Sequence, residues 1–325
     1  SSHFRSCLVA PILPSLRLMA SSWQRWWAAA IAATLVIAMP AKNSTAPQMP
    51  IPTKEIAPGV HMPVISIGTG GLEMPAAADI VANWLALGGR GIDTALIYFD
   101  QAVIPEQLKK AKVNRSEVFI TSKIPGCAGA EAAVQYDLNR LQTDYIDLLL
   151  IHFPKGDCAA AWSVLETFHK RGILKAIGVS NFGREHLEGL LRTATVPPAV
   201  NQIELNVLGY DAEAVAFAQS RNITTEAYSP LGRSGHSGDV PGNEVVRSVA
   251  AKHGVSSYQV ALRWIMQNGH LLTFQSRSRA HQASDADIFG FNLSDAEMRA
   301  LDAQRHTADP ARQDAGAVRL STLMV

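Results

Sequence analysis

Residues 146–151 read Ile146-Asp147-Leu148-Leu149-Leu150-Ile151, a run with a single polar residue. A strand that is so nearly apolar is typical of a parallel sheet, where helices cover both of its faces. Parallel strands need long crossover connections, most often helices, between one strand and the next. The run therefore predicts an α/β protein, provided that similar strands alternate with helices on either side of it.

The flanking sequence shows this alternation. The predicted strands are Val64–Gly68, Gly91–Asp93, Val118–Lys123, Tyr145–His152, Ala176–Ser180, Val200–Glu204, Thr224–Tyr228 and Leu271–Phe274. The predicted helices are Ala76–Leu87, Pro105–Ala111, Ala130–Leu141, Ala159–Lys170, Glu185–Arg192, Ala212–Arg221, Glu244–His253 and Ser257–Gln267. Eight such units within about 240 residues favour a closed (β/α)8 TIM barrel over an open sheet, because closure leaves no edge strand.

Local signals add detail to this barrel. Lys54–Met62 contains Pro58-Gly59, a turn signal between two short extended pieces, so we expect a short N-terminal hairpin that closes the bottom of the barrel. Asp211 precedes an Ala-rich helix, and Ser294 precedes Asp295-Ala296-Glu297. Both are predicted helix N-caps.

The composition narrows the class of partner. The chain has 325 residues, 47% hydrophobic and 18% charged, with a formal net charge of +1. It has no run of five basic residues, so we expect no nucleic-acid partner. The three cysteines, Cys7, Cys127 and Cys158, form no C-x-x-C motif. We expect no thiolate metal site and two unpaired thiols at Cys127 and Cys158, with a bond between these two as the alternative.

The first residues differ from the rest of the chain. Met19 is a possible internal start, and Arg25 precedes the uncharged run Trp26–Ala41, whose 16 residues are few for a membrane-spanning helix of about 20. The basic flank, the apolar run and the small residues around Val36-Ile37-Ala38 predict a signal peptide, with a membrane anchor as the alternative. Residues 19–41 thus predict that the protein is targeted to the secretory route or an organelle, or is anchored in a membrane by its N-terminus. If that segment is an artefact, a cytosolic protein is expected.

Three regions follow from these patterns. Residues 1–50 are expected to be a signal-like or targeting segment and linker, residues 51–305 the barrel, and residues 306–325 a C-terminal tail. We expect the barrel to be a monomer.

Polar residues at the strand ends predict the site, because a barrel of this type carries its chemistry at the carboxyl ends of its strands. Asp93 ends the second strand and Tyr98 follows it, Lys123 ends the third, and His152 ends the fourth. A phenol has an ordinary pKa near 10, and an adjacent ammonium is expected to lower it. The four side chains together predict proton transfer by Tyr98 as general acid.

Six motifs then resemble those of the aldo-keto reductase family, in the family's order and over roughly residues 52–303. They are Gly91-Ile92-Asp93-Thr94-Ala95 with Tyr98, Thr121-Ser122-Lys123, Leu149-Leu150-Ile151-His152-Phe153-Pro154, Lys175-Ala176-Ile177-Gly178-Val179-Ser180-Asn181-Phe182, Asn201-Gln202-Ile203-Glu204 and Ala227-Tyr228-Ser229-Pro230-Leu231-Gly232. The resemblance implies NADPH-dependent reduction of aldehydes or ketones, with Asp93, Tyr98, Lys123 and His152 as the catalytic tetrad.

The resemblance also implies a cofactor site. Ser180, Asn181 and Gln202 match the residues that hold the nicotinamide carboxamide, and Tyr228 matches the ring that stacks on the nicotinamide. The other cofactor-binding positions that it implies are Thr69, Asp93, Ser229, Leu231, Ser234, Ser276, Arg277, Arg279 and Asp285. No G-x-G-x-x-G follows a strand, which is expected of this family.

The eighth strand departs from the family pattern. Gln275 stands where many members have a Lys that grips the 2′-phosphate of NADPH, and His281 stands near the position of a later Arg. Arg277 and Arg279 are expected to replace these charges, because guanidinium groups suit phosphate; solvation of both is the alternative reading. NADPH is the expected cofactor, and NADH remains possible.

The substrate side also departs from the pattern. The loop after His152 is short, and the tail after Ala303 has few aromatic residues, so we expect a shallow, open pocket at Tyr98, His152 and Phe153 that includes Phe99 and Leu72. Two alternatives remain. Some relatives are non-catalytic channel subunits or redox sensors, and a metal-dependent hydrolase would need several strand-end histidines, of which only His152 is present.

Overall fold

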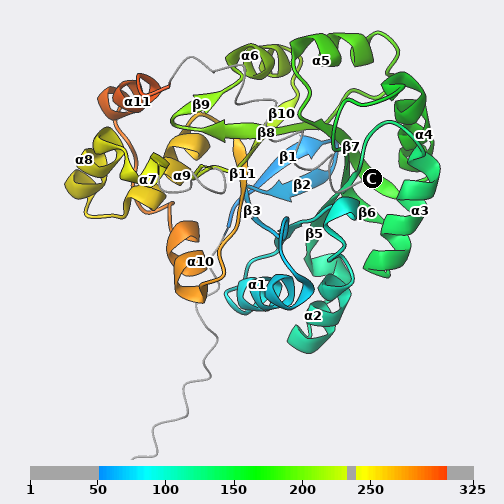
Figure 1. Ribbon diagram of the computed structural model, residues 1–325, viewed down its shortest axis with the longest axis horizontal. Helices are drawn as coiled ribbons and strands as arrows, with labels where there is room; N and C mark the ends of the chain where they lie inside the picture. Colours follow the sequence, from blue (N-terminus) through cyan, green and yellow to red (C-terminus); the bar gives the residue numbers. More distant parts are fainter. Residues whose placement is uncertain (1–50, 233–238, 306–325) are drawn as a thin grey trace, which may run out of the picture. The chain divides into compact units, whose positions relative to one another are not determined.

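The computed structural model describes residues 51–232 and 239–305. Its central sheet consists of eight parallel strands: β3 (Ile65–Gly68), β4 (Gly91–Asp93), β5 (Phe119–Ile124), β6 (Ile146–Ile151), β7 (Leu174–Ser180), β8 (Val200–Asn206), β10 (Thr224–Tyr228) and β11 (Leu271–Phe274). Each of these strands pairs with the next, and β11 pairs with β3, so the sheet closes on itself (Figure 1). The predicted eight-stranded parallel barrel is confirmed.

Helices surround the barrel at the predicted places (Figure 1). They are α1 (Met74–Ala86), α2 (Val103–Ala111), α3 (Ala130–Leu141), α4 (Cys158–Lys170), α5 (Arg184–Leu191), α6 (Ala212–Ser220), α8 (Glu244–His253) and α9 (Ser257–Gln267). The structure adds elements that the sequence did not predict: η1 (Leu96–Tyr98), η2 (Arg115–Glu117), β9 (Gly209–Tyr210), α7 (Asp239–Gly242) and α10 (Arg279–Ala286). It also contains α11 (Asp295–Asp302), whose start was predicted only by the cap at Ser294. No helix in the described ranges has the length and apolar character that a membrane crossing requires.

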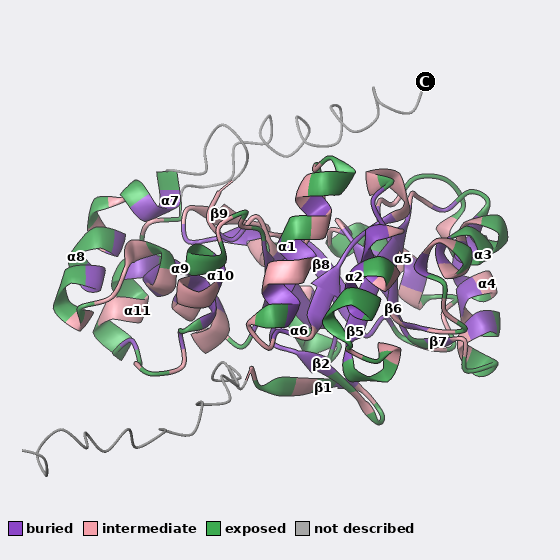
Figure 2. Cartoon of the chain, turned by 90° about the horizontal axis from the view of Figure 1, so that it is seen from below, coloured by how far each residue is buried: buried purple, intermediate pink, exposed green. Residues whose placement is uncertain are grey.

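The predicted N-terminal hairpin is present. It consists of β1 (Thr53–Ala57) and β2 (Val60–Pro63), which pair antiparallel. Gly59 lies in its turn with φ 74°, a left-handed conformation that glycine adopts without steric cost. The hairpin leads into the amino end of β3, and Lys54 donates a hydrogen bond to the backbone oxygen of Gly269, just before β11. It therefore lies at the amino ends of the strands, at one end of the barrel (Figure 2).

Side-chain caps fix the starts of several helices. Asp211 accepts a hydrogen bond from the backbone N–H of Ala214, and Ser294 forms a capping box with Glu297. Such caps satisfy N–H groups that have no partner within the helix, which is typically worth about 1 kcal/mol. Both predicted N-caps are confirmed.

The two cysteines of the barrel form a disulfide, Cys127–Cys158. Cys127 lies in the loop after β5 and Cys158 is the first residue of α4, after β6. Because β5 and β6 are neighbours, their following loops meet at one rim, where the Cys127 N–H donates to the backbone oxygen of Lys155 at 2.8 Å. The expectation of two unpaired thiols was therefore wrong; Cys7 lies outside the described residues.

Candidate active site

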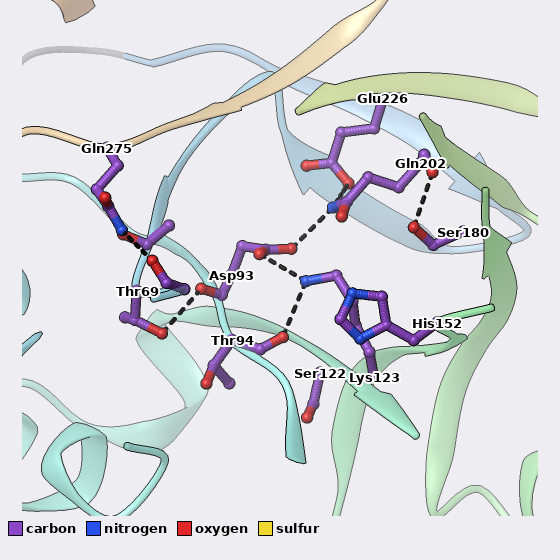
Figure 3. A network of polar contacts seen from close by, with 12 residues as sticks. Thr69, Asp93, Thr94, Ser122, Lys123, His152, Ser180, Gln202, Glu226 and Gln275 are labelled. Atoms are coloured by element: carbon purple, nitrogen blue, oxygen red, sulfur yellow. Dashed lines mark hydrogen bonds and ion pairs between the residues drawn. The ribbon is translucent and has the colours of Figure 1, made fainter. Parts of the chain in front are cut away.

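A buried ion pair lies at the carboxyl ends of β4 and β5. The ammonium of Lys123 lies 2.6 Å from Oδ1 of Asp93 and also donates to the backbone oxygen of Thr94 at 3.0 Å. Both side chains are almost fully buried. Burial alone would lower the pKa of Lys123, but the attraction of Asp93 outweighs it and raises that pKa above its ordinary value. Lys123 is thus a cation whose ammonium is held in one position by Asp93 and Thr94 (Figure 3).

Tyr98 lies beside this pair. It ends η1, half-buried, with its ring centroid 5.3 Å from the Lys123 ammonium and 5.8 Å from the centroid of the His152 ring. Gly70 packs against the phenol, because a Cβ added at Gly70 would lie 2.8 Å from Cζ of Tyr98. The backbone oxygen of Gly70 is itself held by Nε2 of Gln275 at 2.8 Å. The phenol is therefore positioned on three sides.

The proton of Tyr98 is held more tightly than the sequence suggested. Burial raises the pKa of Tyr98 above its ordinary value, and the neighbouring Lys123 opposes this shift without overcoming it. The expected lowering of the phenol's pKa by the ammonium is present, but burial outweighs it, so the net shift is upward. The physical reason is that desolvation of a phenolate costs more here than one ammonium, itself neutralised by Asp93, returns. At neutral pH the phenol carries its proton.

His152 completes the cluster as a neutral imidazole. It follows β6, is 5% exposed, and its ring stacks on that of Phe153 with centroids 4.5 Å apart. Burial, with a smaller contribution from Lys123, lowers the pKa of His152 well below 6.5. Its Nδ1 is buried and has no hydrogen-bond partner in the described part of the chain. Phe153 is half-buried, whereas Phe99 is 63% exposed.

A second polar group continues the rim from β7 to β10. The hydroxyl of Ser180 donates to the backbone oxygen of Gln202 at 2.8 Å, and Nδ2 of Asn181 donates to that of His152 at 3.0 Å. The hydroxyl of Tyr228 donates to Oδ1 of Asn181 at 2.8 Å. The residues predicted to hold a nicotinamide thus form one hydrogen-bonded row, which joins the cluster through His152.

Gln202 shows which way this row can receive a ligand. Its Nε2 donates to Oδ2 of Asp93 and to Oε2 of Glu226, both at 2.8 Å. Because an amide nitrogen has two hydrogens, both are committed, and the Oε1 carbonyl oxygen is left to accept from a ligand. An acceptor at this position fits the N–H₂ of a nicotinamide carboxamide.

Three residues in left-handed backbone stand directly after residues of the candidate site. Phe99, Asn181 and Ser229 have φ values of 60°, 61° and 50°. They follow Tyr98, Ser180 and Tyr228, respectively. Side chains other than glycine adopt this conformation at a cost of roughly 1 kcal/mol or more, and such residues gather at functional sites.

The remaining predicted cofactor residues lie farther along the rim. Thr69 is fully buried, and its N–H donates to the backbone oxygen of Asp93 at 3.0 Å. Leu231 packs against the core, and Ser276 donates to the backbone oxygen of Ser278. Ser234 lies outside the described residues.

The start of α10 presents positive charge to solvent. Arg277 precedes the helix, Arg279 is its first residue, and both are exposed. Ser278 caps the helix by accepting from the N–H of His281. Asp285, in the last turn of α10, is buried, and that burial raises its pKa to about 6. Gln275 is exposed and donates to Gly70 instead of providing the expected Lys charge.

Comparison with known proteins decides the family. The model of the aldo/keto reductase family matches residues 64–305. The chain belongs to the aldo-keto reductase family. It is 38% identical to glyoxal reductase of Bacillus subtilis over 258 residues, which is 77% of this chain and 92% of that protein. It is 37% identical to morphine 6-dehydrogenase of Pseudomonas putida over 262 residues, 75% of this chain and 88% of that protein.

A solved structure agrees with the fold of this aldo-keto reductase. The silkworm (Bombyx mori) aldo-keto reductase in complex with NADPH is 28% identical, with a TM-score of 0.72 over 80% of this chain and 89% of that chain. The protein is therefore an NAD(P)H-dependent oxidoreductase that uses a nicotinamide cofactor and acts on small-molecule carbonyl compounds. Within the described residues, no group of three or more His, Cys, Asp or Glu is arranged to hold a metal ion.

The sequence interpretation of this aldo-keto reductase missed two buried groups beside the tetrad. Glu226 of β10 is fully buried against Gln202. Asp137 of α3, also fully buried, accepts from Nε2 of Gln101 at 2.7 Å and from the hydroxyl of Ser122 at 2.8 Å. The sequence did hold a signal for both: Glu226 lies within a predicted strand, and Asp137 lies on the buried face of a predicted helix. A charged side chain at such a place requires a partner.

Proposed function

We propose that this aldo-keto reductase reduces aldehydes and ketones with NADPH, and that Tyr98 is the general acid. The observation that carries the proposal is a protonated phenol beside a buried ammonium, Lys123, and a neutral imidazole, His152. The bound nicotinamide cofactor supplies the hydride. The side chains of this chain supply the rest: they provide the acid, orient it and hold the cofactor through polar contacts.

Lys123 makes the phenol a usable acid. In the resting protein burial holds the proton on Tyr98, but charge that develops on a carbonyl oxygen next to the hydroxyl draws this proton toward the substrate. The Lys123 ammonium then stabilises the phenolate that is left, and Asp93 keeps the ammonium in place. Because His152 is neutral, one of its ring nitrogens can donate to the carbonyl oxygen and orient it without adding a charge.

The test of Tyr98 is the Tyr98→Phe protein. We expect it to bind NADPH as the wild type does, measured by the change in cofactor fluorescence, and to lose at least about a hundredfold in kcat, since acid–base catalysis contributes roughly 10²–10⁴-fold. A nitrobenzaldehyde and a dicarbonyl such as glyoxal serve as substrates. Turnover of the variant within tenfold of the wild type would refute the assignment, and binding of NADPH by a wild type without turnover would favour a non-catalytic protein.

Arg277 and Arg279 support NADPH over NADH. Two exposed guanidinium groups and the N-terminus of α10 provide positive potential for a 2′-phosphate. We expect Arg277→Ala/Arg279→Ala to weaken NADPH binding by on the order of tenfold or more while NADH binding changes little. Arg192→Ala, an exposed arginine just after α5, is the matched control. Equal losses for both cofactors would overturn this part of the proposal.

The compartment is a separate proposal. Residues 19–41, which suggest the secretory route or an anchor, lie outside the described residues. The Cys127–Cys158 disulfide supports that route, because such bonds persist in oxidising compartments and are rare in the cytosol. Microscopy of the tagged full-length chain, combined with thiol labelling of cells, tests this. A cytosolic protein with both cysteines reduced would contradict it.

A further inference from the structure

Glu226 is a carboxyl group with no assigned role in the interior of the barrel. It lies on β10 opposite Gln202 of β8 in the strand register, and it is fully buried. Its Oε2 accepts from Nε2 of Gln202, and its Oε1 is buried without a hydrogen-bond partner among the described residues. Carboxyl groups are rarely this buried unless they are paired, so this one requires an explanation.

The contacts of Glu226 lead directly to the catalytic pair. Gln202 donates one amide hydrogen to Glu226 and the other to Oδ2 of Asp93, while Oδ1 of Asp93 binds Lys123 (Figure 3). A continuous chain thus runs from Glu226 through Gln202 and Asp93 to Lys123. Glu226 and Asp93 together hold the amide of Gln202 in one direction, because each presents a carboxyl oxygen that accepts from its Nε2.

The charges around Glu226 make its protonation state matter. Asp93 of β4 and Lys123 of β5 are the charged groups that face it. Of the elements packed against β10, β8 presents the neutral Gln202 opposite Glu226 and carries Glu204 two residues farther along, opposite Tyr228, and β11 has no titratable residue. In α6 the acidic Glu213 is exposed and pairs with Arg184. One ammonium, that of Lys123, therefore faces the two carboxyl groups of Asp93 and Glu226 and cannot neutralise both.

The second carboxyl stays neutral under ordinary conditions. Burial and then the negative charge of Asp93 raise the pKa of Glu226 to about 8, against the opposing effects of Gln202 and Lys123. At pH 7 most molecules thus carry Glu226 as a neutral acid, next to the ion pair of Asp93 and Lys123. Above pH 8 the interior holds two carboxylates that share one amide and one ammonium.

We propose that Glu226 is a positioning residue for the reaction: as a neutral acid it holds Gln202 on Asp93, and as a carboxylate it competes with Asp93 for Lys123. The inference rests on the proposed function, in which Lys123 stabilises the phenolate of Tyr98. Ionisation of Glu226 adds a second negative charge that attracts the ammonium of Lys123. The ammonium then stabilises the phenolate less well, which weakens acid catalysis as the pH rises through 8.

The kinetic test compares kcat with saturating NADPH and carbonyl substrate between pH 6 and pH 10. In the wild type we expect kcat to fall about tenfold from pH 7 to pH 9, because about a tenth of the molecules keep a neutral group that titrates near pH 8. Glu226→Gln keeps an acceptor for Gln202 but cannot ionise, so its profile should lack this inflection. An unchanged inflection in folded Glu226→Gln would overturn the proposal.

Two further variants separate charge from hydrogen bonding. Glu226→Leu cannot ionise and cannot accept from Gln202, so we expect no inflection near pH 8 and a kcat at pH 7 that is on the order of tenfold lower. Asp147→Asn removes a half-buried carboxyl on β6 that pairs with Arg115 outside the cluster, and it should keep the inflection of the wild type. Loss of the inflection in Asp147→Asn would contradict the assignment to Glu226.

An infrared measurement on the protein without cofactor or substrate needs no turnover. The wild type should show the C=O stretch of a buried protonated carboxylic acid at pH 7, which disappears as the pH rises through 8; Asp137 and Asp285, whose pKa values are near 6, are mostly ionised by then. Absence of this band in the wild type would overturn the proposal without any variant having to fold. If the band titrates but Tyr98→Phe remains active, the proposed function fails and the neutral Glu226 stands.

Discussion

The ammonium of Lys123 and the carboxylate of Asp93 form a 2.6 Å ion pair that is almost completely removed from solvent. Removal of one partner of a buried pair leaves an uncompensated charge, which typically costs about 3–5 kcal/mol, whereas removal of both is often close to neutral. Single and double variants can therefore separate the effect of the pair on stability from its effect on turnover.

We expect Lys123→Met to lower the free energy of unfolding by about 3–5 kcal/mol, and Asp93→Asn/Lys123→Met to be more stable than Lys123→Met alone. Urea denaturation of the single variants and the double variant measures this. Both proteins that lack Lys123 should be inactive, so regained stability will not restore turnover. Additive losses of stability would show that the two side chains do not act as a pair.

Gly70 provides a test of how closely the phenol must be placed. Gly70→Ala puts a methyl group 2.8 Å from Cζ of Tyr98, so the ring must move. A displacement of this kind should lower kcat by on the order of 10- to 100-fold with little change in NADPH affinity. Gly290→Ala, where a Cβ meets no atom within 4 Å, is the control. Wild-type kcat in Gly70→Ala would mean that Tyr98 tolerates displacement.

The disulfide predicts a redox-dependent stability. Cys127 and Cys158 are separated by 31 residues, and closing a loop of this length is worth about 3–4 kcal/mol in the chain-entropy treatment. We expect a reductant to lower the urea midpoint of the wild type accordingly. Cys127→Ser/Cys158→Ser should have this lower midpoint with or without reductant. A wild type that does not respond to complete reduction would contradict the prediction.

Asp137 predicts a pH dependence of stability. Burial raises its pKa from 3.8 to about 6, against the hydrogen bonds from Gln101 and Ser122. The folded state therefore binds the proton more tightly than the unfolded state, and the resulting stability is present below pH 3.8 and lost as the pH rises through 6.

Asp137→Asn cannot titrate, so relative to this variant the wild type should lose about 3 kcal/mol between pH 4 and pH 7. Urea denaturation across this range, with the exposed Asp79→Asn as control, measures the difference. A constant difference between wild type and Asp137→Asn would rule out a raised pKa at Asp137.

The barrel could be predicted from the sequence because eight short strand-like runs, of which Ile146–Ile151 is the most apolar, alternate with longer helical stretches. The helix α10 could not, and of α11 only the start was indicated, by the cap at Ser294. Both helices are eight residues long and bury few side chains; in α11 only Leu301 is buried. Their amphipathic pattern is too short to stand out from that of a polar loop.

The site was partly predictable for a similar reason. Asp93, Lys123 and His152 mark strand ends, and parallel strands bring their ends together. Glu226 lies within a strand, and its role depends on whether its side chain faces the interior of the barrel. The Cys127–Cys158 bond depends on two loops that meet only after the barrel closes. Three-dimensional proximity of this kind has no local signal in the sequence.

The three left-handed residues at the rim set a limit on how far this protein can be stabilised. Phe99, Asn181 and Ser229 stand where glycine would relieve backbone strain, yet each follows a side chain whose direction the proposed chemistry needs. Directed evolution for heat resistance would be drawn to these positions first. It would then loosen Tyr98, Ser180 and Tyr228, so we expect thermostability and turnover to be traded against each other at the rim and not in the apolar wall of the barrel.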